Sequence, residues 1–258
     1  MDLQLTDKVI FVAGSSRGIG RSIAESFLRE GARTVITGRD RSALDRACSE
    51  LSEKFGDRVL AIPGDFSKDA AISAGFDLTI DRFGRIDHLI GNLGAGSGQP
   101  GWDQPAEEWS RLFELNFHAS TRLAQHLVPH LLANETKGTI LFISSIVALE
   151  ATAAPLPYSA AKAALNNYSK NLARQLGPQG IRVNAIAPGN ILFPGGSWER
   201  HLRDRRDAVE RMIHAEVPMQ RFGTPEEIAS FAVFLCSPHA SFATGACFVV
   251  DGGQTRIL

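Results

Sequence analysis

The chain has 258 residues, of which 44% are hydrophobic and 21% are charged, and its formal net charge is −1. A near-neutral charge gives the whole molecule no attraction to nucleic acid or to an anionic membrane. No apolar stretch is long enough to span a bilayer, and the start "MDLQLTDKVIFVAG" lacks the pattern of a signal peptide. The three cysteines form no CxxC pair, so we expect neither a disulfide scaffold nor a metal site, but a cytoplasmic protein.

Short apolar and β-branched runs alternate with longer stretches of helical pattern along the whole chain. Most of the runs are apolar throughout, as is typical of strands covered on both faces. This alternation predicts an α/β fold, a doubly wound parallel sheet of about seven strands with helices on both faces. Because no Pro/Gly/Ser-rich linker divides the chain, we predict a single domain over residues 1–258. The expected strands start at Lys8, Arg33, Arg58, Arg85, Gly138, Ile181 and Ala246.

Two irregular segments interrupt this pattern, and a clear helix start follows the second. Residues 94–109 begin with a Gly/Pro-rich loop that leads into a helix, and residues 190–218 form an insertion before the last helix. "TPEE" at Thr224 has the form of a capping box with proline at the first helical position. The insertion contains "ERHLRDRRDAVER", in which opposite charges four residues apart, such as Glu199/Arg203 and Asp207/Arg211, predict a solvated helix rather than a nucleic-acid surface.

The first expected strand ends in the glycine-rich stretch "AGSSRGIG". Gly14, Gly18 and Gly20 are spaced G-x-x-x-G-x-G between a strand and a helix, where the backbone can approach a phosphate and the helix N-terminus can bind it. The same stretch also fits G-x-S-x-G, the nucleophile elbow of serine hydrolases, with Ser16 as the nucleophile. That elbow follows several strands in hydrolases, whereas here it would follow the first, so the phosphate loop is the preferred interpretation.

A phenol and an ammonium group share one face of a later helix. Tyr158 and Lys162, in "YSAAK", are four residues apart. A free phenol titrates near pH 10, and a cation about 5 Å away at an effective dielectric of about 20 favours the phenolate by roughly 3 kcal/mol. Lys162 is therefore expected to lower the pKa of Tyr158, although such a pair alone is common on helix surfaces.

Together these motifs resemble those of the short-chain dehydrogenases/reductases, from the first strand to the C-terminus. The active-site serine of that family lies thirteen residues before the tyrosine, at Ser145 here, and its asparagine matches Asn116 in "ELNF". Its N-N-A-G motif is present as "GNLG", with Asn92 and Gly94 kept. Its P-G motif matches Pro188 and Gly189, and a "DGG" follows near the end.

The resemblance implies a Rossmann-type cofactor site and a catalytic set of Asn116, Ser145, Tyr158 and Lys162. The neighbouring Ser144 is expected only to hydrogen-bond the backbone. In "GDFS", Asp65 and Phe66 are expected against the adenine. One position departs from the family, because Phe193 stands where a threonine often lies near the cofactor's carboxamide. The expected cofactor contacts are Gly14, Ser16, Arg17, Gly18, Ile19, Gly20, Arg39, Asp65, Phe66, Asn92, Gly94, Tyr158, Lys162, Pro188, Gly189 and Ile191.

The second strand indicates which nicotinamide cofactor is bound. A site that prefers NAD usually has an acid at its end to bind the ribose 2′-hydroxyl. Here that position is Gly38, followed by Arg39, and Arg17 lies in the glycine loop. Two guanidinium groups can bind a 2′-phosphate, so we predict NADP(H), with NAD(H) as the alternative. Asp40 is interpreted as a helix N-cap.

These features predict an NADP(H)-dependent oxidoreductase that interconverts a ketone and a secondary alcohol. Tyr158 is expected to exchange the proton, Ser145 to stabilise the substrate oxygen, and Lys162 to hold the nicotinamide ribose. Asn116 is expected to position a water that joins Lys162 to solvent. Residues 190–218 are expected to be a lid over a small-molecule substrate. The alternative is a non-catalytic NADP(H)-sensing protein of the same fold. By analogy with the family we expect a homo-oligomer, a tetramer or a dimer.

Overall fold

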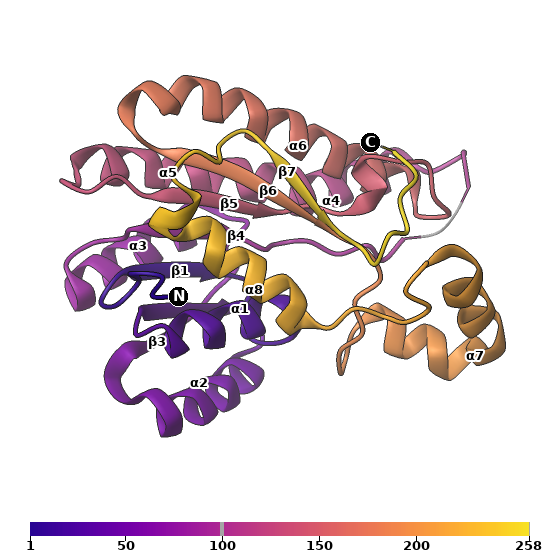
Figure 1. Cartoon of the computed structure of the whole chain (residues 1–258), viewed down its shortest axis with the longest axis horizontal. Coiled ribbons are helices and arrows are strands. Elements are labelled where there is room, and N and C mark those ends of the chain that lie inside the picture. Colours follow the sequence, from indigo (N-terminus) through magenta and orange to yellow (C-terminus); the bar gives the residue numbers. More distant parts are fainter. Residues whose placement is uncertain (99–100, 258) are drawn as a thin grey trace.

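In the computed structural model, which describes residues 1–98 and 101–257, seven strands form one parallel sheet (Figure 1). Residues 99 and 100, in the loop expected from Gly94, lie outside the described part of the chain. The strand order is β3-β2-β1-β4-β5-β6-β7, which confirms the doubly wound sheet. The strands are β1 (Val9–Ala13), β2 (Arg33–Gly38), β3 (Val59–Pro63), β4 (His88–Gly91), β5 (Thr139–Ile143), β6 (Arg182–Pro188) and β7 (Cys247–Val250).

Because the order reverses between β1 and β4, the carboxyl edge of the sheet beside these two strands is where open α/β sheets bind ligands. Every residue of β1 and β5 is buried, which explains why all of them except Thr139 are apolar. The helices are α1 (Gly18–Arg29), α2 (Arg41–Phe55), α3 (Asp69–Phe83), α4 (Ala106–Phe113), α5 (Ala119–Ala133), α6 (Leu156–Leu176), α7 (Ser197–Glu216) and α8 (Pro225–Cys236). Single helical turns are η1 (Gly56–Arg58), η2 (Glu114–His118), η3 (Ile146–Ala148), η4 (Gly177–Gln179) and η5 (Pro238–Ala240).

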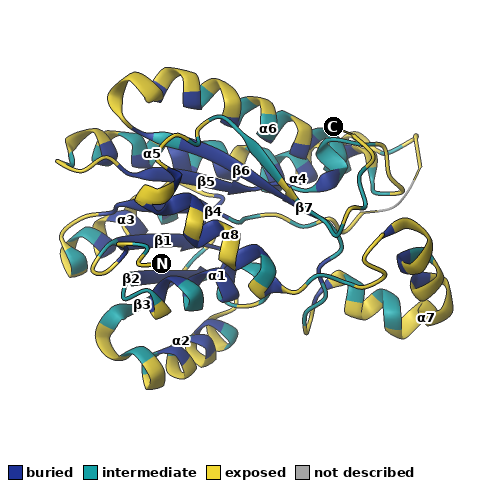
Figure 2. Ribbon diagram, viewed as in Figure 1, coloured by how far each residue is buried: buried dark blue, intermediate teal, exposed yellow. Residues whose placement is uncertain are grey.

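Two apolar layers cover the two faces of the sheet, and Figure 2 shows the buried strands between them. One layer joins the sheet to α1, α2 and α8, and the other joins it to α3, α5 and α6. In the second layer the rings of Phe11 and Phe76 meet edge to face with centroids 4.8 Å apart. Burying each such ring stabilises the fold by roughly 1.5–3 kcal/mol, so the sheet is a rigid base for the loops at its edge.

Two helix starts have the caps that the sequence predicts. The Asp40 side chain accepts a hydrogen bond from the Ala43 N–H at the start of α2. Thr224 and Glu227 form a reciprocal capping box at the start of α8. None of the described helices is both long enough and apolar enough to cross a membrane.

Helix α7 extends away from the sheet (Figure 1) and buries only Val209 and Ile213 among its residues. Its backbone is non-helical at Arg205, where φ is −154°, so it consists of two shorter helices across a kink. Within the described residues its ion pairs are Arg206–Glu210 and Arg203–Asp204, not the two expected pairs. The expected Glu199/Arg203 pair is wrong because the Glu199 carboxylate instead accepts a hydrogen bond from the backbone N–H of Gly195.

Candidate active site

The glycine loop is fixed to β2 and to the loop after β4. The Gly14 N–H donates to Thr37 Oγ1 at 3.0 Å, and the Thr37 N–H donates to Ser15 Oγ at 2.8 Å. Asn92 Nδ2 donates to the Gly14 carbonyl at 2.7 Å. Ser15 and Thr37 were not singled out from the sequence, because a serine or threonine at a strand end gives no signal of the cross-strand bond that it makes.

The first and third glycines of the loop have clear geometric tasks. Gly14 has a φ of 71°, which lets the chain turn out of β1. A Cβ at Gly20 would lie 2.3 Å from the Gly14 carbonyl oxygen, so helix α1 can approach the strand only because this residue is glycine. The N-cap of α1, Arg17, makes no side-chain capping bond, so no side chain caps the first N–H groups of α1, the groups that bind an anion at a helix N-terminus.

Arg17 is exposed at the N-cap of α1, and Arg39 is exposed directly after β2. A Cβ at Gly38 would lie 3.1 Å from the Ser16 side chain, so a larger residue at that position would require Ser16 to shift by a few tenths of an ångström. Burial acts to raise the pKa of the Asp65 carboxyl. Hydrogen bonds from Ser67 and the nearby Arg39 guanidinium oppose this effect, and the pKa lies below its usual value. The exposed Arg39 guanidinium thus lies beside the Asp65 carboxylate, and the Arg17 guanidinium donates to the Gly195 carbonyl.

The side chain of Phe66, a residue expected against the adenine, is buried. Its side chain is 2% exposed and its ring packs against that of Phe11 at 5.4 Å. A Cβ at Gly75 would lie 2.5 Å from the same ring, so glycine on α3 makes room for it. The Phe66 ring is thus part of the core, and only its backbone can face an adenine beside Asp65. A large apolar ring is more stable in the core than at the exposed rim.

The predicted catalytic residues converge at the carboxyl end of β5. Ser145 follows the strand, and Tyr158 and Lys162 lie in the first two turns of α6. Lys162 is 3% exposed and its Nζ donates to the Ile143 carbonyl at 2.8 Å. The Ser145 side chain hydrogen-bonds to Tyr158. Residues distant in the sequence therefore form one cluster of hydroxyls and an ammonium.

Asn116 lies in η2, a single turn of π-helix between α4 and α5. Its Nδ2 donates to the carbonyls of Leu112 and Ala95, and its Oδ1 accepts from the Ala95 N–H at 3.1 Å. A Cβ at Gly94 would lie 2.6 Å from Asn116 Oδ1 and 3.1 Å from Lys162 Nζ. The extra residue of the π turn thus aims Asn116 at the loop that passes Lys162.

The same loop also passes close to Tyr158, at Gly96. A Cβ at Gly96 would lie 3.3 Å from the Tyr158 ring. No sequence pattern points to Gly96, because its neighbour Tyr158 is 62 residues away in the chain and the two meet only after folding.

Burial raises the pKa of the Tyr158 phenol, and the hydrogen bond with Ser145 lowers it by less. Burial also lowers the pKa of Lys162 to about 8. The expectation that Lys162 lowers the pKa of Tyr158 is therefore wrong for the protein without its cofactor. The reason is that loss of water dominates at both groups, and the ammonium is directed at the Ile143 carbonyl.

Ser144 does not have the hydrogen bond that was expected of it. Its Oγ is buried without a hydrogen-bond partner in the described part of the chain. Its backbone N–H donates to the Ile186 carbonyl at 2.7 Å. The backbone of Ser144 thus continues the hydrogen-bond ladder between β5 and β6. The serine side chain that bonds to the backbone is that of Ser145, whose Oγ accepts from the Val147 N–H at 3.4 Å.

Pro188 ends β6, and the N–H of Gly189 donates to the Val250 carbonyl at 3.0 Å. A Cβ at Gly189 would lie 2.7 Å from the Asp251 backbone, so the P-G and D-G-G motifs pack directly together. Ile191 is 7% exposed, and its neighbour Phe193 reaches back to the glycine loop.

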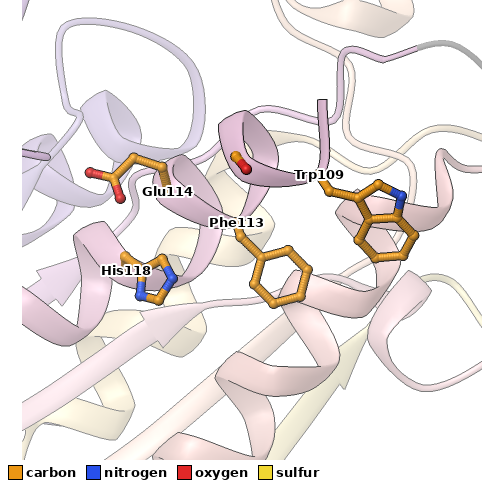
Figure 3. A pocket seen from close by; sticks show the side chains of 5 residues that line it. Trp109, Phe113, Glu114 and His118 are labelled. Atoms are coloured by element: carbon orange, nitrogen blue, oxygen red, sulfur yellow. The ribbon is translucent and has the colours of Figure 1, made fainter. Parts of the chain in front are cut away.

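One surface hollow lies away from the predicted site. It has a volume of about 380 Å³, is lined by Trp109, Ser110, Phe113, Glu114 and His118, and is shown in Figure 3. None of these residues belongs to the predicted site. A smaller hollow of about 100 Å³ lies at the base of the 190–218 segment and includes Ile191. Among residues 1–98 and 101–257, no cluster of three or more His, Cys, Asp or Glu residues could hold a metal ion.

Comparison with known proteins shows similarity over nearly the whole chain. A family model described as enoyl-(acyl carrier protein) reductase matches residues 13–255. Glucose 1-dehydrogenase 2 of Bacillus subtilis (strain 168) is 33% identical over 253 residues, which cover 97% of this chain and 96% of that protein.

Two solved structures are also similar. L-sorbose reductase from Gluconobacter frateurii, complexed with NADPH and L-sorbose, has a TM-score of 0.93 and 36% identity, with 100% of both chains covered. A 7α-hydroxysteroid dehydrogenase complexed with NADH and 7-oxo glycochenodeoxycholic acid has a TM-score of 0.90 and 32% identity. That comparison covers 100% of this chain and 98% of the other.

Proposed function

Because the chain belongs to the short-chain dehydrogenase/reductase family, whose members act on CH–OH groups with a nicotinamide cofactor, we propose that it is an NADP(H)-dependent oxidoreductase of ketones and secondary alcohols. The observation that carries this proposal is the cluster of Ser145, Tyr158 and Lys162 at the same sheet edge as the glycine loop. Family membership also removes the reason to assign Ser16 as a hydrolase nucleophile.

The residues beside the glycine loop fit a phosphorylated dinucleotide. The uncapped start of α1 offers N–H groups to the pyrophosphate, and the exposed Arg17 and Arg39 offer charge-assisted hydrogen bonds to a 2′-phosphate. Asp65, the Phe66 backbone and Asn92 line the route from adenine to nicotinamide, and Gly94, Pro188, Gly189 and Ile191 lie toward its far end. When bound, NADP(H) supplies or accepts the hydride at the substrate carbon.

Tyr158 and Ser145 bind the substrate oxygen in this proposal. In the reductive direction both hydroxyls donate to the carbonyl oxygen, which gains negative charge as the carbon gains hydride. Tyr158 then gives its proton to that oxygen, so the product is an alcohol, and the phenolate regains a proton from solvent. Lys162 would hold the nicotinamide ribose and keep a positive charge near the phenol. Asn116, fixed by Ala95 and Leu112, positions the water that connects Lys162 to solvent.

The segment 190–218 is proposed to be the substrate lid, since it connects the P-G motif to a helix that packs loosely on the body. The chain is further proposed to be one cytoplasmic domain that assembles as a homotetramer. The sugar and steroid ligands named in the solved structures support a small-molecule carbonyl or alcohol substrate without selecting one.

A panel of sugars, steroids, acyl thioesters and small alcohols, assayed with NADPH and NADH or their oxidised forms, tests the proposal. We expect turnover of at least one ketone or secondary alcohol, with higher kcat/KM for NADP(H). A clear preference for NAD(H) contradicts the cofactor assignment. Reduction of a carbon–carbon double bond alone contradicts the reaction. Tight NADP(H) binding without turnover on the whole panel favours the non-catalytic sensor.

A further inference from the structure

The stretch from Asn190 to Gly196 carries the chain from β6 past the glycine loop to α7. Two backbone hydrogen bonds fix its base, because Leu192 N donates to the Gly223 carbonyl at 3.0 Å and Gly223 N donates to the Asn190 carbonyl at 2.9 Å. Ile191 is buried beneath them. The residues that follow are therefore held against the body of the protein at the start of the lid.

The ring of Phe193 fills the space beside Gly18. A Cβ at Gly18 would lie 2.6 Å from Phe193 Cε2 and 2.8 Å from its Cζ. In a dinucleotide-binding glycine loop one glycine makes the turn, one lets the pyrophosphate approach the backbone, and one lets the helix pack on the strand. Gly14 makes the turn and Gly20 lets the helix pack, which leaves Gly18 as the approach for the pyrophosphate.

A tight turn holds the ring in this place. Gly196 N donates to the Phe193 carbonyl at 3.0 Å, and Gly195 has a φ of 75°, which a type II turn requires at its third residue. The turn also binds the glycine loop directly, since Arg17 Nη1 donates to the Gly195 carbonyl at 3.2 Å. On the other side, Gly195 N donates to Glu199 at 2.7 Å. Phe193 is thus positioned by both the lid and the loop.

We propose that Phe193 occupies, in the free protein, the position that the cofactor's pyrophosphate takes, so that this residue sets the affinity for NADP(H). The inference rests on the proposed function, because it takes the glycine loop as the cofactor site. Cofactor binding must move the Phe193 ring away from Gly18. When Arg17 binds the 2′-phosphate, its hydrogen bond to the Gly195 carbonyl must also break.

The expected change in cofactor affinity depends on the fraction of free protein molecules that can bind the cofactor. The apparent dissociation constant equals the intrinsic one divided by the fraction of free molecules whose ring is withdrawn. If that fraction is about one tenth, removal of the ring tightens cofactor binding about tenfold, which corresponds to about 1.4 kcal/mol.

Calorimetric titration without substrate tests this inference. The wild type, Phe193→Ala and Phe222→Ala are each titrated with NADP⁺ and with adenosine 2′-monophosphate, which has no pyrophosphate. Phe222 is the matched control, because its ring lies 5.5 Å from that of Trp198 in the lid. We expect Phe193→Ala to bind NADP⁺ about tenfold more tightly and adenosine 2′-monophosphate as the wild type does, with no gain for Phe222→Ala.

Equal or weaker NADP⁺ binding by Phe193→Ala overturns the inference, because the ring would then be a neutral or favourable wall of the site. Equal tightening for both ligands, or the same gain in Phe222→Ala, overturns it as well. Phe193→Thr carries the same expectation and replaces the alanine variant if that variant fails to fold in a thermal scan. Failure of the wild type and both Phe193 variants to bind NADP⁺ or NAD⁺ contradicts the proposed function itself.

Discussion

Burial favours the neutral form of two neighbouring side chains at the start of α6. It raises the pKa of the Tyr158 phenol and lowers that of the Lys162 ammonium to about 8, so each group is pushed toward its neutral form. The free protein therefore holds a protonated phenol, which is the form that a carbonyl reductase needs. Positive charge from an oxidised nicotinamide would favour the phenolate, which alcohol oxidation needs.

Replacement of Tyr158 by phenylalanine removes the proposed proton donor while keeping the ring that packs on Gly96. We expect kcat to fall by roughly 10²- to 10⁴-fold, the usual contribution of a positioned acid or base, while cofactor affinity stays within a few-fold. Steady-state kinetics together with a cofactor titration measure the two quantities.

The matched control for this change is Tyr168→Phe. Tyr168 is the other tyrosine of the chain, lies on the same helix, and packs with Phe117 and Phe142 rather than with Ser145. It should keep near wild-type kcat. Equal activity of Tyr158→Phe and the wild type on an identified substrate would refute the assigned proton transfer.

Lys162 makes stability depend on pH in a defined direction. Its pKa is about 8 in the folded protein against 10.5 unfolded, so between these values the unfolded chain binds more protons and stability rises with pH. The unfolding free energy of the wild type minus that of Lys162→Met should rise by roughly 3 kcal/mol from pH 8 to 10.5. Denaturant unfolding of both proteins across this range measures the difference. A flat difference would show that Lys162 titrates normally.

At the scale of elements, glycines decide how closely the first helix and the loops approach the sheet. Gly20→Ala would force a Cβ to 2.3 Å from the Gly14 carbonyl oxygen and 2.5 Å from Asn92 Nδ2. We expect a loss of roughly 1–3 kcal/mol in unfolding free energy, with weaker cofactor binding because the loop must move. Chemical denaturation checks the first effect.

Gly177→Ala is the control for that substitution. Gly177 has a helical φ of −53° and nothing within 4 Å of its Cβ position. Alanine there should be neutral or slightly stabilising, since it restricts the unfolded chain. A similar loss at both positions would show that the crowding at Gly20 is not the cause.

The connection between α4 and α5 shows what periodicity misses. The spacing of apolar residues predicts helix here, but not the π turn at residues 114–118 that aims Asn116 at Ala95. One extra residue per turn leaves little trace in a short sequence pattern, because the helices on both sides continue with ordinary geometry.

At the scale of the whole molecule, the near-neutral charge and the exposed aromatic residues favour self-association. Phe231 and Phe234 on α8 are 43% and 40% exposed, and Phe242 after it is fully exposed. Exposed apolar groups of this kind mark interaction surfaces when they gather on one face. We expect a species of about four times the 27.9 kDa chain mass in sedimentation. Phe234→Glu should shift it to smaller species, and a monomeric wild type would contradict the tetramer.

The amino-acid pattern alone predicted the parallel α/β fold, because continuous apolar runs between helical stretches can be buried only as strands covered on both faces. It also identified Ser145, Tyr158, Lys162 and the three glycines of the loop after β1, since their spacing is local or matches a family motif. It did not determine the surroundings of these groups. The pKa directions, the burial of Phe66 and the contact of Phe193 with Gly18 depend on residues far apart in the chain. Only tertiary packing brings them within a few ångströms, where water is lost and contacts are made.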